Sequence, residues 1–246
     1  ASNASQGYIM AWYGGSADKV KVQITGGGST YTYNLNTAGR KEVFPLTMGD
    51  GSYTVAVYER VTGNQYALAY SKQISVKLES AFLPFLYPNQ YVNFSASSRT
   101  VSVAGTLAAD AADQLGVVTN IYNYVISHIT YDSYKAANVQ SGYLPSVDST
   151  LAAGTGICFD YAAVMAAMLR SQQIPTRLEV GYVSGGTYHA WISTYIAEVG
   201  WVDGIIQFDG KSWKLMDPTF ASNGGSSPEI MQFIGNGANY QMKYRY

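Results

Sequence analysis

Apolar and polar side chains alternate along the first third of the chain, and this pattern restricts that part to β structure. Four runs follow the alternation, and glycine-rich turns separate them: residues 19–24, 31–35, 53–58 and 73–78. No helical spacing of apolar residues falls between these runs. Short strands in close succession are typical of antiparallel sandwiches. We therefore predict a small Ig-like β-sandwich over residues 1–85, in which one face of each sheet meets solvent.

The pattern changes between residues 80 and 95, where Pro84 and Pro88 interrupt any regular element. Helical spacing then predicts helices over 109–129 and 158–172. Strands are predicted over 176–183, 187–197, 204–208, 212–217 and 240–246, with hairpin turns at 185–186 and 209–210. Helices followed by antiparallel strands predict an α+β domain over residues 86–246.

Composition argues against several classes of function. The 15 basic and 16 acidic residues leave a net charge of −1, so no basic surface for nucleic acid is expected. The longest apolar stretch, 162–169, is far shorter than the roughly 20 residues of a membrane span. One cysteine and two histidines argue against a metal site, and no cofactor is expected.

The same composition bears on where the protein acts. A charged fraction of 13%, with 22 tyrosines and 25 glycines, suits a secreted or cell-surface protein. The first residues, 1–5, contain neither an initiator methionine nor an apolar leader. We expect a signal peptide that has been removed, and a cell-surface or cell-wall ligand for the N-terminal sandwich.

Cys158 stands at the start of the predicted helix 158–172, directly after Gly154, Thr155 and Gly156. The positive end of a helix stabilises a thiolate, and its free N–H groups can hold an oxyanion. Gly156 would leave room for the main chain of a substrate. The alternative is a buried structural cysteine, since free cysteine is often buried.

His189 and Asp217 could complete a catalytic group with Cys158. His189 lies on a predicted strand, and Trp191, two residues further on, shares its face and could shield the imidazole from water. Asp217 ends another strand before Pro218, where its carboxylate could accept the second ring N–H of His189. Each has a structural alternative, a satisfied histidine and an Asp-Pro turn, but the three in order favour nucleophilic catalysis.

These residues match the motifs of a known family. Its cysteine helix is similar to four pieces of this sequence: Gly156-Ile157-Cys158, Tyr161-Ala162, Met168-Leu169-Arg170 and Ile174-Pro175-Thr176-Arg177. The family is the transglutaminase-like superfamily. His189-Ala190-Trp191 resembles its histidine strand and Asp217-Pro218-Thr219 its aspartate strand. The resemblance covers roughly residues 90–246 and leaves out the first 80.

The resemblance implies a papain-like α+β core in which helices pack on an antiparallel sheet. Carried over to this sequence, it makes Cys158 the nucleophile, His189 the base and then the acid, and Asp217 the orienting carboxylate. Two features depart from the family. Gln173 stands where glycine is common, and the interval from His189 to Asp217 is long, so residues 197–210 should form an extra hairpin or loop. Its acidic residues suggest an acidic rim or a solvated face.

A second oxyanion donor is not evident from the sequence. Tyr131 and Tyr143 are candidates because they precede the cysteine helix among other aromatic residues. Tyr188, Trp191 and Trp201 are candidates for contacts with substrate. Ordinary packing is the alternative for each of them in a chain with 22 tyrosines.

The sequence therefore predicts a cysteine-dependent acyl-transfer enzyme that hydrolyses peptide or amide bonds of a protein or peptide substrate through a thioester. Transamidation, in which an amine replaces water, is one alternative. A second is a catalytically silent surface-binding module, and a third is a lasting covalent adduct between Cys158 and a partner protein.

Overall fold

The computed structural model describes residues 3–197, 200–203, 205–208, 213–216 and 239–246. The chain divides into two compact units, Ala1–Pro84 and Phe85–Tyr246. The short helix η2 (Leu83–Phe85) lies at their border, within the proline-containing segment where the sequence pattern changes.

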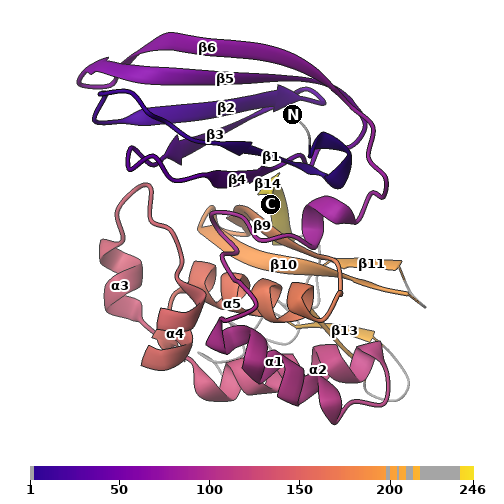
Figure 1. Cartoon of the computed structure of the whole chain (residues 1–246). Coiled ribbons are helices and arrows are strands. Elements are labelled where there is room, and N and C mark those ends of the chain that lie inside the picture. Colours follow the sequence, from indigo (N-terminus) through magenta and orange to yellow (C-terminus); the bar gives the residue numbers. More distant parts are fainter. Residues whose placement is uncertain (1–2, 198–199, 204, 209–212, 217–238) are drawn as a thin grey trace. The chain divides into compact units, whose positions relative to one another are not determined.

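The N-terminal unit is built from two antiparallel sheets (Figure 1). The larger has the order β3-β2-β5-β6, and the smaller pairs β1 with β4. Their bounds, with the short helix η1 before them, are η1 (Ala4–Gln6), β1 (Tyr8–Ala11), β2 (Val20–Gly26), β3 (Ser29–Leu35), β4 (Glu42–Pro45), β5 (Gly51–Thr62) and β6 (Gln65–Val76). The β-sandwich predicted from the alternation is the architecture found.

The core of this unit follows from the alternation. Val20, Val22 and Ile24 on β2 are all buried, whereas the residues between them are only partly so. The rings of Tyr33 on β3 and Phe44 on β4 pack edge to face, with centroids 5.0 Å apart. This contact joins the two sheets, because each ring comes from a different one.

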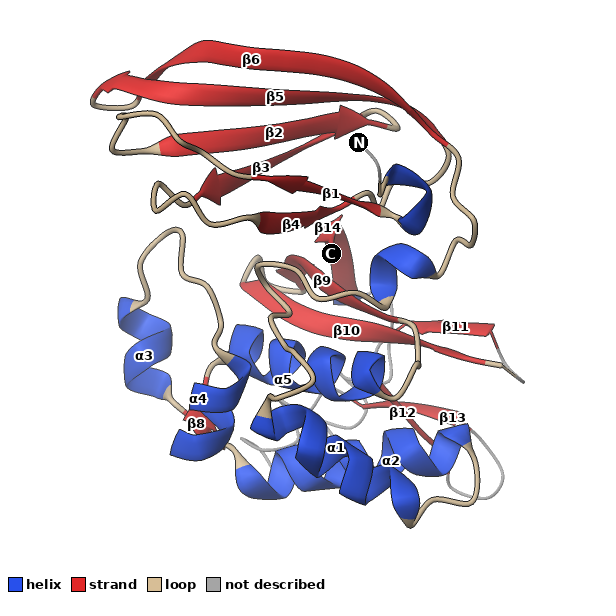
Figure 2. Cartoon of the chain, viewed as in Figure 1, coloured by secondary structure: helices blue, strands red, loops and turns tan. Residues whose placement is uncertain are grey.

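In its described residues, the C-terminal unit combines five helices with an antiparallel sheet of order β11-β10-β9-β14 (Figure 2). The helices are α1 (Arg99–Ala109), α2 (Gln114–His128), α3 (Ser133–Asn138), α4 (Val147–Ala153) and α5 (Cys158–Ser171). The sheet strands are β9 (Thr176–Val183), β10 (Tyr188–Ile196), β11 (Gly200–Asp203) and β14 (Tyr240–Arg245). Two further pairs are parallel β7 (Thr130–Tyr131) with β8 (Thr155–Gly156), and antiparallel β12 (Ile205–Phe208) with β13 (Trp213–Met216).

Helix α5 is the centre of this unit. Its residues 160–170 are all buried. It packs against β9 and β10 on one side and against α1, α2 and α4 on the others, so that it lies between the sheet and helices α1 and α2 (Figure 1). A helix that is apolar all round belongs in a core. The position of Cys158, its first residue, is fixed by that burial.

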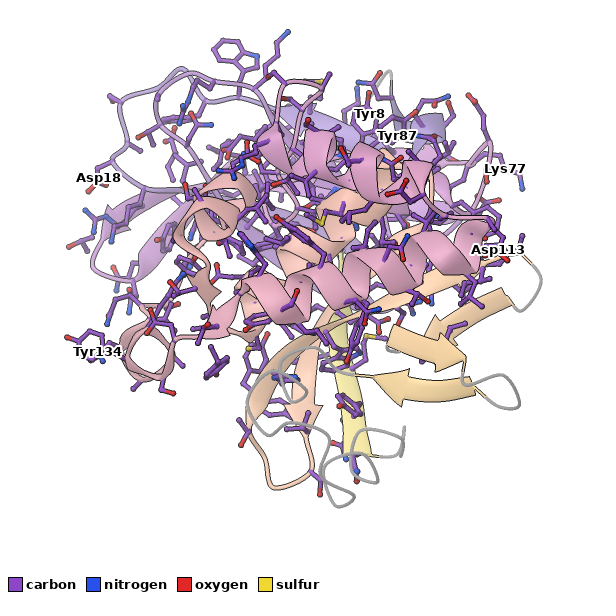
Figure 3. All side chains as sticks on the ribbon, turned by 90° about the horizontal axis from the view of Figure 1, so that it is seen from below. Tyr8, Asp18, Lys77, Tyr87, Asp113 and Tyr134 are labelled. Atoms are coloured by element: carbon purple, nitrogen blue, oxygen red, sulfur yellow. The ribbon has the colours of Figure 1, made fainter. Side chains whose placement is uncertain are left out.

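The prediction of one helix over residues 109–129 is wrong for residues 110–113, which separate two helices. Helix α1 ends at Ala109 and α2 begins at Gln114, where the Asp113 carboxylate caps it by accepting the Gly116 N–H (2.8 Å; Asp113 is labelled in Figure 3). Helix α1 was not predicted, because its first residues are polar and do not begin an apolar stripe. The Thr100 backbone N–H and hydroxyl of α1 donate to Asp148 of α4, at 2.9 and 2.6 Å.

The strands agree more closely with the prediction. β9, β10 and β14 fall within one or two residues of the predicted ranges, as do β12 and β13. The turn at Gly185 and Gly186 has the positive φ angles, +94° and +78°, that a tight hairpin needs. The predicted extra segment 197–210 begins as a hairpin, because β11 turns back to pair with β10. The predicted turn at 209–210 lies outside the described residues.

Gln173 ends helix α5 in a conformation that favours glycine. Its φ is +60°, and it is the one non-glycine residue with positive φ in the part of the chain that the structure describes. The Gln173 N–H donates to the carbonyl of Arg170, and the Ile174 N–H to that of Leu169 (3.0 Å each). These two bonds form a Schellman motif, in which the left-handed position is usually glycine.

We expect Gln173→Gly to raise the free energy of unfolding by about 1 kcal/mol, because a side chain in the left-handed region costs roughly that much. The melting temperature should rise by about 2–4 °C in a thermal scan. Gln172→Gly is the matched control. Gln172 has φ −94° and gains nothing from glycine, so that variant should lose stability. Equal effects of the two variants would contradict this account.

Candidate active site

Cys158 begins α5, the most buried of the helices that the structure describes, and keeps a partly exposed side chain. Ile157 before it is the N-cap, in extended conformation. The first N–H groups of a helix have no acceptor within the helix, and they give its start a positive charge. The thiol therefore lies at a helix end that stabilises a thiolate and can donate hydrogen bonds to an oxyanion.

Two glycines bring the chain into this helix start. Gly154 has φ +64° and ends α4 in the left-handed region. At Gly156, an added Cβ would lie 2.7 Å from the Cβ of Asp160. Gly156 was predicted to leave room for substrate, and the structure also gives it a packing role, since only glycine lets β8 pass this close to the first turn of α5.

Asp160 fills the first turn of α5 with a fully buried carboxylate. Its Oδ2 accepts the Ile157 N–H at 2.9 Å and the Lys135 Nζ at 2.6 Å, and its Oδ1 accepts the Tyr143 hydroxyl at 2.5 Å. Lys135 Nζ also donates to the Tyr143 hydroxyl at 2.7 Å. This cluster could not be predicted from the sequence, because no local pattern indicates that Lys135 contacts a residue 25 positions away.

The predicted oxyanion candidates Tyr131 and Tyr143 occupy different places. Tyr131 on β7 is paired in register with Gly156 on β8. Burial raises the pKa of Tyr131, and the negative charge of a Cys158 thiolate adds to the rise. Tyr143 is instead held by Asp160 and Lys135. Of the two, Tyr131 is the one paired with the glycine that precedes the cysteine helix.

Helix α3 and the segment after it surround a hollow of about 640 Å³ on this side of the helix start. Lys135, Val139 and Tyr143 are among the residues that line it. Tyr134, also at its wall, is 80% exposed and points outward from α3 (Figure 3). The ring of Tyr143 packs against that of Phe159, whose centroid is 6.4 Å away. Tyr143, which lines the hollow, thus contacts Phe159, the residue after Cys158.

Strand β10 brings Tyr188 and His189 to the same end of α5. Burial raises the pKa of Tyr188 most, and the charges of Tyr182, Tyr244 and Cys158 add to it. His189 is the next residue along, and its side chain is buried. Because β10 packs directly on α5, the structure brings the histidine strand and the cysteine helix together.

The imidazole of His189 lies beside two aromatic rings, stacked on Trp191 and tilted against Tyr240. Its centroid is 6.3 Å from the ring of Trp191 and 6.4 Å from that of Tyr240. Trp191 is anchored in turn, because its Nε1 donates to Glu179 Oε2 at 2.9 Å, and the Ser193 hydroxyl donates to the same oxygen at 2.6 Å. The buried Glu179 thus fixes the ring beside the histidine.

Trp201 and Asp217 are the remaining predicted site residues. Trp201 on β11 packs against the rings of Phe85 and Tyr195, and the Arg177 guanidinium lies 3.5 Å from its ring centroid. Asp217, the predicted orienting carboxylate, lies outside the described residues. Its role stays a prediction.

The described residues contain no group of three His, Cys, Asp or Glu side chains that could hold a metal ion. Among the helices that the structure describes, none is long and apolar enough to cross a bilayer.

Comparison with known proteins identifies the segment that carries the site. Residues 101–204 match the family model described as the transglutaminase-like superfamily. This stretch of the chain is similar to that superfamily. It contains Cys158 and His189 and ends before Asp217. The resemblance inferred from the sequence is confirmed, and so is the predicted class, an α+β core of helices on an antiparallel sheet after a β-rich unit.

Solved structures give more distant similarities. A "putative cysteine protease" from Cytophaga hutchinsonii is 17% identical, with 86% of this chain and 78% of that one covered and a TM-score of 0.43. The periplasmic domain of TgpA from Pseudomonas aeruginosa is 14% identical, with 94% and 92% covered and a TM-score of 0.42. Red sea bream transglutaminase is 11% identical, with 93% and 51% covered and a TM-score of 0.39. No curated protein sequence gives a match to this chain.

The burial of Glu179 should make the stability of the protein depend on pH. Burial raises the pKa of Glu179 above its ordinary 4.5 and outweighs the hydrogen bond from Ser193, which lowers it. A raised pKa contributes stability that is present at low pH and lost as pH rises through the folded-state pKa. Glu179→Gln keeps an oxygen for Trp191 and Ser193 but cannot ionise. We therefore expect this variant to gain stability relative to the parent as pH rises from about 4 to 7.

Asp148→Asn is the control with the opposite sign. Partial burial raises the pKa of Asp148, but the hydrogen bonds from Thr100 and Arg99 outweigh it and lower the pKa below its ordinary 3.8. The Asp148→Asn variant should therefore lose most stability at neutral pH and least at low pH. Urea unfolding at several pH values measures how the free energy of unfolding of each variant, relative to the parent, changes with pH. Changes of the same sign in the two variants would contradict the assignment.

Proposed function

We propose that the protein is a cysteine-dependent hydrolase that cleaves peptide or amide bonds of protein or peptide substrates through a thioester on Cys158. The observation that supports this most is the position of the chain's single cysteine. It is the first residue of a buried helix, it is partly exposed, and the strand that carries His189 packs on the same helix.

In the proposed reaction, the Cys158 thiolate attacks the carbonyl carbon of the substrate and a carbon–sulfur bond forms. The N–H groups at the start of α5 hold the oxyanion. His189 gives its proton to the nitrogen as the carbon–nitrogen bond breaks, and the amine leaves. Water, deprotonated by His189, then attacks the thioester, which releases the acid and restores the thiolate. Asp217 is proposed to accept the second ring N–H of His189.

The aromatic residues around the thiol are assigned to the substrate side of this reaction. Tyr131 is proposed as the second oxyanion donor, because β7 pairs it with Gly156, two residues before Cys158, and a Cys158 thiolate adds to the effect of burial in raising its pKa. Tyr188, half exposed and next to His189 on β10, is proposed to contact the substrate. Trp191 shields the imidazole. If an amine takes the place of water at the thioester, the same residues carry out transamidation.

The first test is the rate of Cys158 alkylation by iodoacetamide as a function of pH. We expect the parent protein to react with a midpoint well below the value of about 8.5 for a free thiol, because the imidazolium of His189 stabilises the thiolate. His189→Ala should move the midpoint back toward that value. At neutral pH, the rate should then fall by about tenfold or more.

His128→Ala is the matched control, since the chain has two histidines. His128 on α2 is hydrogen-bonded through Nε2 to the Leu151 carbonyl at 3.0 Å and is given no part in the reaction. This variant should keep the parent midpoint. A thiol that is inert in the folded chain, or that behaves as a free thiol in all three proteins, would overturn the proposal and favour a catalytically silent binding module. A lasting adduct with a partner protein would favour a covalent adhesin.

A further inference from the structure

The first turn of α5 holds a negative charge that the proposed reaction does not use. Asp160 lies two residues after Cys158, and its carboxylate is completely buried. Both of its oxygens accept hydrogen bonds, from the Ile157 N–H, the Lys135 ammonium and the Tyr143 hydroxyl. These partners come from the N-cap of α5, from α3, and from the segment that follows α3.

This carboxylate and a thiolate on Cys158 compete for the same positive helix end. An acidic residue in the first turn of a helix is stabilised by the partial positive charge there, as a thiolate is. Two negative groups in the first turn of one helix repel one another, and salt screens the repulsion only weakly when one of them is buried. An unpaired Asp160 would therefore oppose the formation of the nucleophile.

Lys135 supplies the charge that removes this conflict. Burial lowers the pKa of Lys135, but its hydrogen bonds to Asp160 and Tyr143 outweigh that effect and raise it, so the ammonium stays charged at neutral pH. The ion pair has an Nζ to Oδ2 distance of 2.6 Å. With Lys135 in place, the pair is neutral, and the positive end of the helix remains available to the thiolate.

The other titratable groups near the helix start cannot perform this task. Tyr131 and Tyr188 have raised pKa values, mainly through burial, and are neutral at neutral pH. The Asp132 carboxylate accepts the Lys135 backbone N–H at 2.8 Å and caps α3. His189 on β10 is the proposed partner of the thiolate itself. Lys135 is thus the cation bonded to Asp160.

We propose that Lys135 is a positioning residue for Cys158: it neutralises the buried Asp160, so that the start of α5 stabilises the catalytic thiolate rather than a carboxylate. This inference rests on the function proposed above, because it concerns the same thiol. It adds an electrostatic partner from outside the cysteine, histidine and aspartate group.

The test is a charge cycle read by the pH dependence of Cys158 alkylation. Lys135→Met leaves Asp160 unpaired and should raise the midpoint by about one pH unit, which slows alkylation roughly tenfold at a fixed pH below it. Asp160→Asn leaves the ammonium unpaired and should lower the midpoint. The double variant contains neither charge and should return close to the parent, although it lacks the whole ion pair.

A purely structural role predicts a different result. If the pair only held α3 against α5, the two single variants would shift the midpoint in the same direction and the double variant would resemble them. That outcome, or no shift in any variant, would overturn the proposal. Lys135→Arg keeps the charge and should restore the parent midpoint. Lys77→Met removes a surface ion pair with Asp50 in the N-terminal unit and should change nothing.

Failure of this inference can be distinguished from failure of the proposed function. If His189→Ala leaves the midpoint unchanged while the charge cycle gives opposite shifts, the ion pair tunes a thiol that has no histidine partner. If His189→Ala shifts the midpoint and the charge cycle does not, the enzyme assignment stands and Lys135 is structural. Circular dichroism of each variant before alkylation shows that it is folded.

Discussion

The site depends on the burial of helix α5 over residues 160–170. Strands β9 and β10 cover one side of it, and helices α1, α2 and α4 cover the others. Small residues on the helix, among them Ala162, Ala163, Ala166 and Ala167, allow these neighbours to approach closely. Cys158 is held at a fixed place because it is the first residue of that helix.

Burial creates a need for polar partners at both ends of α5. At the start, Asp160 satisfies the Ile157 N–H and is itself satisfied by Lys135 and Tyr143. At the end, the guanidinium of the buried Arg170 donates to three backbone carbonyls. These belong to Thr176, Tyr87 and Tyr246, at distances of 2.9, 2.8 and 2.6 Å.

The two ends have different consequences. Burial lowers the pKa of Arg170 to about 9, which leaves it charged at neutral pH. Its hydrogen bonds connect the helix end to the start of β9, to the segment after the unit border and to the residue after β14. The far end of α5 is therefore bonded to the start of β9 and to the residue after β14, whereas the near end carries the thiol that is the proposed nucleophile.

Features with a local signal could be predicted from the sequence. The alternation gave the sandwich strands, the continuous apolar stretch gave α5, and the glycine pair gave the β9–β10 turn. The family motif placed Cys158 and His189 on the helix and the strand that the structure brings together. Gln173, noted as standing where the family has glycine, has the left-handed conformation that explains the preference.

Features that depend on contacts distant in the sequence could not be predicted. Helix α1 has a polar start that becomes buried only because Asp148 of α4 accepts its hydrogen bonds. The Lys135–Asp160 pair joins residues from two helices, and neither residue has a distinctive neighbour in the sequence. Glu179 carries no local sequence signal, and only the register that sets it opposite Trp191 reveals its role.

The proposed reaction requires Cys158 to form a thioester with its substrate. The most direct test is to mix the folded protein with an activated peptide ester and quench with acid within the first turnover. Mass spectrometry of the intact chain then measures the mass added. The account predicts one acyl group per chain, mapped to Cys158, released by hydroxylamine and absent from Cys158→Ala. No adduct on the folded protein, with normal acylation of the same thiol after unfolding in urea, would contradict it.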